Sequence, residues 1–336
     1  MNVFMVGGTG LLGSLAADEF INRGHSVKTL ALAGLPNGAK LPEKMEIVFG
    51  NHIEMTDDQL TDMMSGCDCF VFAAGVDERV EFPTPIYDYY VKYNIDPVKR
   101  FLSIAKACGV KKSVILGSYF TYLDRVRPDM QLCKHHPYIK SRVEQQKVAF
   151  SFADETMDVG VLELPYIFGT QAGRKPVWTI FVEKLEKMGP VSCFPTGGTA
   201  MLTARQVGEA IVGVAQINVG ANFYPVATEN YTWGQMLTQV HIGMGKPKRK
   251  YIPVPKASFK LYGKFLKMMS HKKGLGEGLD MVMLADIMYN ETFIDPKGTY
   301  ELGVTADDID AAIIESIKVS VDAGKNKTSY VEMKAE

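Results

Sequence analysis

The first stretch of the chain, MNVFMVGGTGLLGSLAADEFINRGHSVKTLAL (residues 1–32), contains the pattern that decides the fold. Its opening apolar run, NVFMV, is typical of a strand covered on both faces of a parallel sheet. Gly7, Gly10 and Gly13 follow at G-x-x-G-x-x-G spacing, and then come an apolar stripe of helical period and the strand-like run SVKTLAL. The segment therefore predicts a β-α-β unit with a glycine-rich turn before its helix.

Glycine in this turn would let an anionic ligand reach the backbone. A Cβ atom would keep a pyrophosphate away from the turn and from the helix N-terminus, where free N–H groups and the helix dipole favour an anion. A glycine triplet placed between a strand and a helix favours a dinucleotide site over a turn without a ligand. Thr9, Leu11 and Leu12 belong to the same turn and are predicted to line the cofactor.

Strands and helices continue to alternate along the chain. Strand-like runs cover 45–51, 67–75 and 111–118, and helical patterns cover 58–66 and 93–109. This alternation predicts an α/β fold, a doubly wound parallel sheet of the Rossmann type, which binds ligands at the carboxyl ends of its strands. We expect a smaller, mostly helical substrate-binding part towards the C-terminus.

The predicted division of the chain has three parts. The dinucleotide-binding domain covers 1–168, with 201–230 returning to it. The substrate-binding part covers 169–200 and 231–330, and the polar residues 331–336 are predicted to be a tail.

Composition narrows the classes of function. The 336 residues are 46% hydrophobic and 22% charged, with a formal net charge of −1, so no overall field favours nucleic acid. Five scattered cysteines without a C-x-x-C pair favour free thiols over disulfides or a metal site. The chain opens on a strand pattern, and no apolar run reaches the length of a membrane span. These features predict a cytoplasmic protein.

Several motifs together resemble a known family. GGTGLLG, GCDCFVFAAG, YNIDPVKRFLSIAKACGVKKSVILGS, HPYIKSRVEQQ and VLELPYIFG come in the order and spacing of the extended short-chain dehydrogenases/reductases, the NAD-dependent epimerase/dehydratase family. The resemblance covers residues 1–230 and thins beyond them. It implies a nicotinamide cofactor, a small-molecule substrate and, as one option, a homodimer.

The resemblance assigns roles to individual residues. Ser118 ends the fifth strand where the family has its catalytic Ser or Thr, and Tyr138 and Arg142 fall on the catalytic Tyr and Lys. Tyr138 and Arg142 are also expected to contact the cofactor. Further cofactor contacts are implied at the ends of the other strands, namely at Leu32, Asn51, His52, Ala74, Gly75, Pro165 and Ile167. His135 and His136 precede the tyrosine, but histidines in such loops more often serve the structure, so neither is assigned a role.

Arg142 departs from the family, which has lysine at this position. A tyrosine with an ordinary pKa of about 10 needs a nearby cation to act as an acid–base near neutrality. Arg142 lies one helical turn after Tyr138 and can supply charge and donors, but it does not readily lose a proton. We expect Arg142 to lower the pKa of Tyr138 without relaying protons itself.

The cofactor and the substrate remain partly open at this stage. No acid stands near Leu32 to exclude a 2′-phosphate, and Lys28 and Lys40 are candidates to contact one, so the sequence favours NADP while NAD stays an alternative. Nucleotide-sugar members commonly have an Asn in the segment that aligns with 165–167, and this chain has none. Arg174 and Lys175 are nevertheless available to a diphosphate.

Three functions fit these observations. The leading prediction is an NAD(P)-dependent oxidoreductase that transfers hydride between nicotinamide and a ketone or alcohol of a small, moderately apolar substrate. The alternatives are a nucleotide-sugar epimerase or dehydratase, and a cofactor-binding sensor without chemistry. Residues 256–273 interleave aromatic, Leu and Met residues with lysines. They fit a lid over the substrate, a membrane-surface contact or, most commonly, a packed helix with a solvated lysine face.

Overall fold

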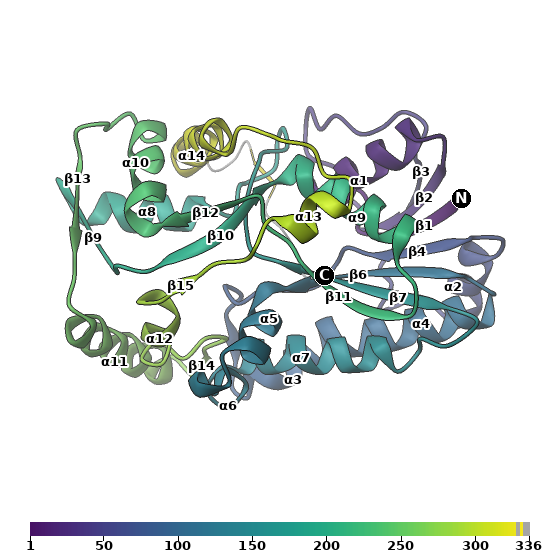
Figure 1. The fold of residues 1–336 in the computed structure, drawn as a ribbon, viewed down its shortest axis with the longest axis horizontal. Helices are drawn as coiled ribbons and strands as arrows, with labels where there is room; N and C mark the ends of the chain where they lie inside the picture. The colour runs from purple at the N-terminus through teal and green to yellow at the C-terminus, as the bar shows by residue number, and fades with distance from the viewer. Residues whose placement is uncertain (327–329, 332–336) are drawn as a thin grey trace.

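The computed structural model describes residues 1–326 and 330–331, and its largest feature is a seven-stranded sheet (Figure 1). The strand order is β11-β7-β6-β4-β1-β2-β3, and every neighbouring pair is parallel. Its strands are β1 (Asn2–Val6), β2 (Ser26–Ala31), β3 (Glu46–Phe49), β4 (Cys69–Phe72), β6 (Lys112–Ser118), β7 (Asp158–Leu164) and β11 (Ala221–Pro225). The predicted doubly wound α/β fold is confirmed.

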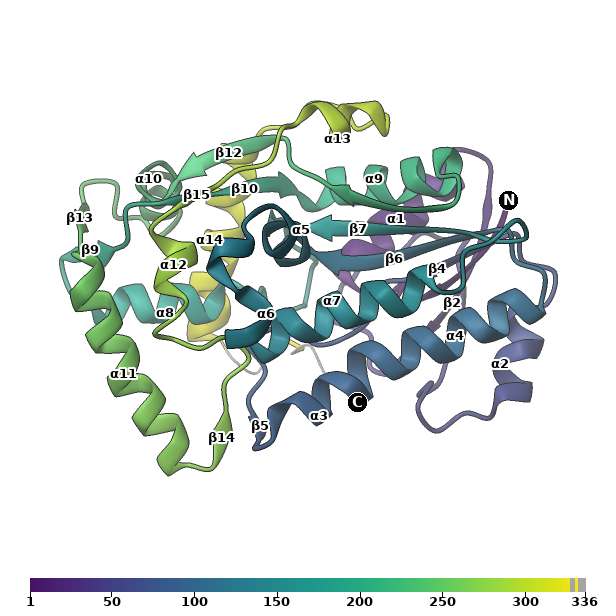
Figure 2. The same cartoon turned by 60° about the horizontal axis from the view of Figure 1, so that its bottom comes forward.

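Helices cover both faces of this sheet (Figure 2). α1 (Leu11–Asn22) and α9 (Ala204–Ile217) pack together on one face, where they meet Val3 and Met5 of β1. Phe4 and Val6 point to the opposite face, which is covered by α2 (Asp57–Met64), α4 (Asp96–Ala107) and α7 (Pro137–Phe150). Burial on both faces explains why the opening strand is apolar throughout rather than alternating.

A second, smaller sheet is built around β10, and it forms the second part of the fold together with the helices around it. β10 (Gly198–Thr203) pairs with β12 (Glu229–Thr232), β15 (Glu291–Thr292) and β8 (Tyr166–Phe168). The helices around it are α8 (Thr179–Lys187), α10 (Trp233–Gly243), α11 (Lys256–Lys272), α12 (Ala285–Met288), α13 (Lys297–Glu301) and α14 (Ile309–Lys325). The sequence did not indicate this sheet, because its strands are short and pair across long separations.

The remaining elements are short. Two strand pairs lie outside the sheets, and they join β9 (Val191–Phe194) to β13 (Lys250–Pro253) and β5 (Phe82–Pro83) to β14 (Leu275–Gly276). The short helices are α3 (Ile86–Tyr90), the π-turn η1 (Val91–Ile95), α5 (Tyr119–Val126), the 3-10 turn η2 (Pro128–Met130) and α6 (Leu132–His135). Among the described helices, none combines the length and the apolar character that crossing a membrane requires.

The chain returns to the first sheet late in its course, since α9 packs on α1 and β11 pairs with β7. The predicted boundary at residue 168, with 201–230 returning, stays a proposal. Of the predicted tail 331–336, only Val331 is described, and its backbone bonds to Gly173 and Lys175. Residues 332–336 lie outside the described residues.

A buried ion pair fixes the helices that follow β6 and precede β7. The Glu163 carboxylate is fully buried and accepts from Thr121 at 2.6 Å, from Arg125 at 2.9 and 2.8 Å, and from Gln146 at 3.0 Å. Thr121 and Arg125 belong to α5, and Gln146 belongs to α7. Because both carboxylate oxygens of Glu163 accept hydrogen bonds from within the protein, we interpret this acid as structural. It ties both helices to β7 and thereby sets the position of α7.

Candidate functional site

The glycine-rich turn is closed by backbone packing that excludes side chains. Gly7 has a φ of +92°, and a Cβ on it would lie 2.6 Å from the Ala73 carbonyl oxygen. A Cβ on Gly13 would lie 2.3 Å from the Gly7 oxygen, so α1 can approach the turn only through glycine. Gly10 is the N-cap of α1 and provides no side-chain cap, which leaves the first N–H groups of the helix for another acceptor. This geometry fits the pyrophosphate of a dinucleotide.

A loop from the second part lies against this turn. The Thr9 carbonyl oxygen accepts from the Gln171 amide at 3.1 Å and from Arg174 Nη2 at 3.4 Å. Arg174 also donates to Gln171 Oε1 at 2.7 Å, and burial lowers the pKa of its guanidinium. Leu11 and Leu12 are half-buried beside Thr9. The turn is therefore held by side chains that the sequence placed among the substrate contacts.

Three of the predicted cofactor contacts lie after β2 and β3. Leu32 follows β2, and Asn51 and His52 follow β3 at the adjacent strand end. Asn51 is engaged locally, since it donates to Glu54 at 3.1 Å and accepts from the Ile53 N–H at 3.0 Å. His52 is held by its carbonyl, which accepts from Arg100 at 2.7 Å, and burial followed by Arg100 lowers its pKa.

The two lysines considered for a 2′-phosphate differ in their surroundings. Lys28 pairs with Glu46 at 3.3 Å, three residues before the end of β2. Lys40 is exposed in the loop after that strand. Of the two, Lys40 has no ion pair among the described residues and is the better placed to contact a 2′-phosphate.

Ala74 and Gly75 follow β4 and are shaped by a buried asparagine. Asn94 lies in the π-turn η1 and is fully buried, with its side chain bonded to both the N–H and the carbonyl of Val76, at 2.8 and 3.0 Å. Gly75 has a φ of +125°, and a Cβ on it would lie 2.7 Å from Asn94 Oδ1. Only glycine fits there, because Asn94 occupies the space that a side chain would need.

Ser118, Tyr138 and Arg142 come together at the carboxyl ends of β4 and β6. Ser118 is the last residue of β6, and Tyr138 and Arg142 lie one turn apart at the start of α7. Arg142 Nη2 donates to the Leu116 carbonyl at 2.9 Å, and Nη1 would lie 3.7 Å from a Cβ on Gly75. The buried Arg142 Nε has no hydrogen-bond partner among the described residues. An unpartnered buried donor beside the cofactor turn fits a ribose hydroxyl.

Burial, rather than Arg142, controls the proton on Tyr138. Burial raises the pKa of Tyr138 to about 12, although Arg142 and a hydrogen bond with Ser118 act in the opposite direction. Glu78 and Asp77 raise the pKa further. Arg142 therefore lowers the pKa of Tyr138 as expected, but burial raises it by more, and Tyr138 is a neutral phenol at pH 7.

The loop that follows Gly75 also belongs to this site, although no motif in the sequence predicted it. Asp77 and Glu78 are close enough to raise the pKa of Tyr138, and Arg79 pairs with both acids. Burial, followed by Asp77, raises the pKa of Glu78. The sequence offered one signal, a charged triplet (residues 77–79) shortly after the small residues that follow β4. Ligands bind at the carboxyl ends of parallel strands, and this triplet lies there.

Tyr90 is a second missed residue. It is fully buried, and its ring meets the Tyr138 ring edge-to-face at 5.5 Å. Its hydroxyl has no hydrogen-bond partner among the described residues, and burial followed by Tyr138 raises its pKa strongly. No sequence motif distinguishes Tyr90 from its neighbours Tyr89 and Tyr93; the packing alone selects it.

Residues 274–283 form a strap across the start of α7. Gly278 accepts the Tyr138 N–H at 2.9 Å, and a Cβ on Gly278 would lie 2.1 Å from the Tyr90 hydroxyl. His136 Nδ1 accepts from the Asp280 N–H at 3.0 Å. His136 is thus a buried anchor for the strap rather than an acid–base group at a site entrance.

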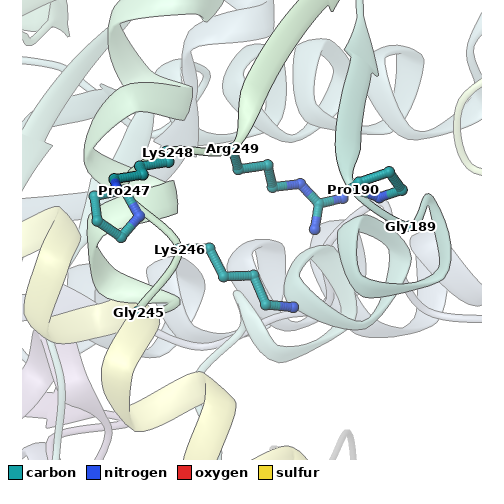
Figure 3. A pocket seen from close by; sticks show the side chains of 7 residues that line it. All are labelled: Gly189, Pro190, Gly245, Lys246, Pro247, Lys248 and Arg249. Carbon is teal, nitrogen blue, oxygen red and sulfur yellow. The ribbon is translucent and has the colours of Figure 1, made fainter.

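Two predicted contacts follow β7 at the strand end that pairs with Ser118, whereas one surface hollow lies apart from the predicted site residues. Pro165 joins β7 to β8, and the Ile167 carbonyl in β8 accepts from Trp178 at 2.9 Å. A hollow of about 560 Å³ lies near β9 and β13, lined by Gly189, Pro190, Gly245, Lys246, Pro247, Lys248 and Arg249 (Figure 3). Arg249 bonds Ser192 at 2.8 Å and the Val191 carbonyl at 2.9 Å. None of the predicted site residues lines this hollow.

The profile of the NAD dependent epimerase/dehydratase family matches residues 3–202. The chain belongs to this family. The resemblance predicted from the sequence is confirmed, and the matched range contains the glycine turn, Ser118, Tyr138 and Arg142. No relative was found among the curated proteins.

Solved structures of similar fold match nearly the whole length of this chain. WbmH of Bordetella bronchiseptica, solved in complex with NAD+, has a TM-score of 0.67 at 14% identity, over 96% of this chain and 99% of that one. The UDP-N-acetylglucosamine 4-epimerase of Methanobrevibacter ruminantium gives 0.65 at 15%, over 96% and 98%. The human epimerase family protein SDR39U1, solved with NADPH, gives 0.65 at 13%, over 95% and 99%. At these identities the likeness shows the fold.

The His136 anchor should make stability depend on pH. Burial lowers the pKa of His136 to about 4, an effect that Asp280 partly opposes. The unfolded chain takes up this proton first as the pH falls below about 6.5, so the free energy of unfolding should fall by about 2 kcal/mol between pH 7 and pH 5. Urea unfolding of the wild type and His136→Asn across this range measures the difference. The same dependence of the free energy of unfolding on pH in both proteins would contradict the role of His136 as an anchor.

Proposed function

We propose that this family member is an NAD(P)-dependent oxidoreductase that transfers hydride between nicotinamide and a ketone or alcohol carbon. The observation that supports it best is the convergence of Ser118, Tyr138 and Arg142 beside a glycine-rich dinucleotide turn. Buried aromatic residues surround this point, among them Tyr90, Tyr119 and Phe120. They favour a small, moderately apolar substrate.

The chain's own residues would handle the proton and the carbonyl oxygen. Tyr138, neutral at pH 7, is the proton donor to the developing alkoxide in ketone reduction. Ser118, whose side chain lowers the pKa of Tyr138, orients the same oxygen. Arg142 stabilises the phenolate that remains after proton donation, because its guanidinium lies 5.8 Å from the centre of the Tyr138 ring. The strap and α7 keep water away from this exchange.

The cofactor contacts follow from the turn and from Arg142. A bound nicotinamide dinucleotide supplies or accepts the hydride. The turn from Gly7 to Gly13 would hold its pyrophosphate, and the free Nε of Arg142 would donate to a ribose hydroxyl. We further propose a preference for NADP, since no acid follows β2 and Lys40 is exposed in the next loop.

A nucleotide-sugar epimerase is the second candidate. The Methanobrevibacter ruminantium structure is an epimerase in complex with UDP-N-acetylmuramic acid, and its fold matches nearly the full length of this chain. An epimerase would use the same three residues but return the hydride to its substrate. Incubation with ketones and with sugar nucleotides distinguishes the two: an oxidoreductase changes absorbance at the nicotinamide band stoichiometrically, whereas an epimerase does not.

Gly10→Val should abolish cofactor binding while the protein stays folded. An added Cβ at Gly10 would lie 3.3 Å from its nearest neighbour, the Gly7 oxygen, so the turn can adapt, but the branched side chain would occupy the anion's space. Titration calorimetry with NADPH and NADH should show no binding by the variant and tighter binding of NADPH by the wild type. The matched control is Gly298→Val, whose added Cβ would meet no atom within 4 Å. Unchanged affinity in Gly10→Val would remove the turn as the cofactor site.

Tyr138→Phe should lower the rate by about 10²- to 10⁴-fold, as expected for removal of a positioned general acid. Arg142→Lys should retain activity, and Arg142→Ala should slow alcohol oxidation and shift its rise with pH upwards, because less charge stabilises the phenolate. Profiles of kcat/KM from pH 7 to 10 measure both effects. A single profile shared by arginine, lysine and alanine would contradict the role of Arg142, and full activity in Tyr138→Phe would contradict Tyr138 as the proton donor and with it the assigned site.

Tyr90→Phe tests whether the unpartnered hydroxyl contacts the substrate. Phenylalanine keeps the edge-to-face contact with Tyr138 and removes only the orphaned oxygen, so stability should rise slightly or stay unchanged. If the hydroxyl donates to the substrate, KM should rise about tenfold or more with little change in cofactor affinity. Steady-state kinetics and thermal unfolding are compared, with Tyr89→Phe as control. An unchanged KM would leave Tyr90 as a packing residue.

A further inference from the structure

The exposed side of α11 is apolar. Its five large apolar side chains that face solvent are Leu261 (70% exposed), Tyr262 (59%), Phe265 (52%), Met268 (48%) and Met269 (40%). Leu261, Phe265, Met268 and Met269 are spaced at i, i+4, i+7 and i+8, which places them along one stripe of the helix. A surface helix of a globular protein ordinarily turns such a stripe inward. We call these five residues the α11 stripe.

The inward side of α11 is packed on the body of the protein, where the Phe259 ring meets the Tyr289 ring at 5.8 Å, and ion pairs add to this contact. Lys256 and Lys260 pair with Asp286 at 2.8 and 3.4 Å, and Lys267 pairs with Asp280. Gly263 is buried against the next segment, where a Cβ would lie 2.5 Å from the Met281 carbonyl oxygen. These contacts fix the rotation of the helix, so the α11 stripe stays outward. α11 is therefore a packed helix that exposes apolar side chains as well as lysines.

Uncompensated positive charge borders the α11 stripe. Residues 256–273 contain six lysines and no acid. Lys264, Lys272 and Lys273 are exposed and make no ion pair among the described residues. The net charge of −1 for the whole chain thus conceals a local cationic patch around the most exposed apolar helix.

We propose that the α11 stripe and its three free lysines dock on the surface of an anionic lipid bilayer. Apolar side chains would enter the boundary of the acyl chains while the lysines meet the head groups, as in helices that lie in the membrane plane. Charge argues against a second copy of this chain as the occupant, because pairing two such faces would bring the same unpaired lysines together. The proposal does not depend on the proposed chemistry.

The position of α11 links this surface to the candidate site. α11 stands at the outer edge of the second part and leads through β14 into the strap (Figure 2). β14 pairs with β5, and two residues later Gly278 accepts the Tyr138 N–H. A bilayer bound at the α11 stripe would therefore lie beside the segment that covers Tyr138, and no part of the chain would need to span the membrane.

Co-sedimentation of the full chain with vesicles tests the proposal. The protein should bind vesicles that contain phosphatidylglycerol, bind pure phosphatidylcholine vesicles at least about tenfold more weakly, and dissociate as salt is raised. The double variant Leu261→Ser with Phe265→Ser should lose at least about tenfold in partitioning. The triple variant Lys264→Glu, Lys272→Glu and Lys273→Glu should lose the preference for anionic lipid. Circular dichroism checks that each variant is folded.

A matched control removes exposed apolar area elsewhere. Ile217 and Val219 are 51% and 75% exposed, and the double variant Ile217→Ser with Val219→Ser should bind vesicles like the wild type. Absence of binding to anionic vesicles, or equal binding by the α11 variant and the wild type, would overturn the proposal. Sedimentation equilibrium without lipid covers the remaining outcome: a dimer that the Leu261→Ser, Phe265→Ser variant abolishes would assign the stripe to a second copy instead.

Discussion

The parallel pairing of the seven strands is the constraint on which the rest of the structure depends. Because every strand points the same way, each carboxyl end reaches one edge of the sheet, and the residues that follow β1, β4 and β6 become neighbours. The close packing of Gly13 on Gly7, where an added Cβ would lie 2.3 Å from the Gly7 oxygen, follows from this constraint. It places the N-terminus of α1 at that edge, and the turn, Gly75 and Ser118 then face a common space.

The chemistry of that space depends on how burial compares with charge. Arg142 supplies the cation that a tyrosine acid–base needs, yet the buried site and the acids after β4 keep the proton on Tyr138. A neutral phenol suits proton donation in reduction. Oxidation would need a further source of positive charge before the phenolate forms near neutrality. The site is therefore set up for one protonation state, and Arg142 modulates the pKa without reversing it.

The second part of the chain acts on the site through a few specific contacts. Gln171 and Arg174 hold Thr9 in the glycine-rich turn, and the strap bonds the first turn of α7 through Gly278 and His136. These contacts come from segments more than 130 residues apart from their partners. They explain how a mostly separate part of the fold can shape a site whose three candidate catalytic residues all belong to the first 142 positions.

The sequence by itself determined the fold class and the glycine-rich turn, because strand and helix periods and turn glycines are local properties. Its resemblance to the family implied the roles of Ser118, Tyr138 and Arg142. It could not show that Tyr90 has an unpartnered hydroxyl or that His136 anchors a strap, because both depend on side chains far apart in the chain. Nor could it settle the direction of α11. An amphipathic pattern specifies two faces, and only the packing of Phe259 and Gly263 against distant segments decides which residues of α11 face solvent.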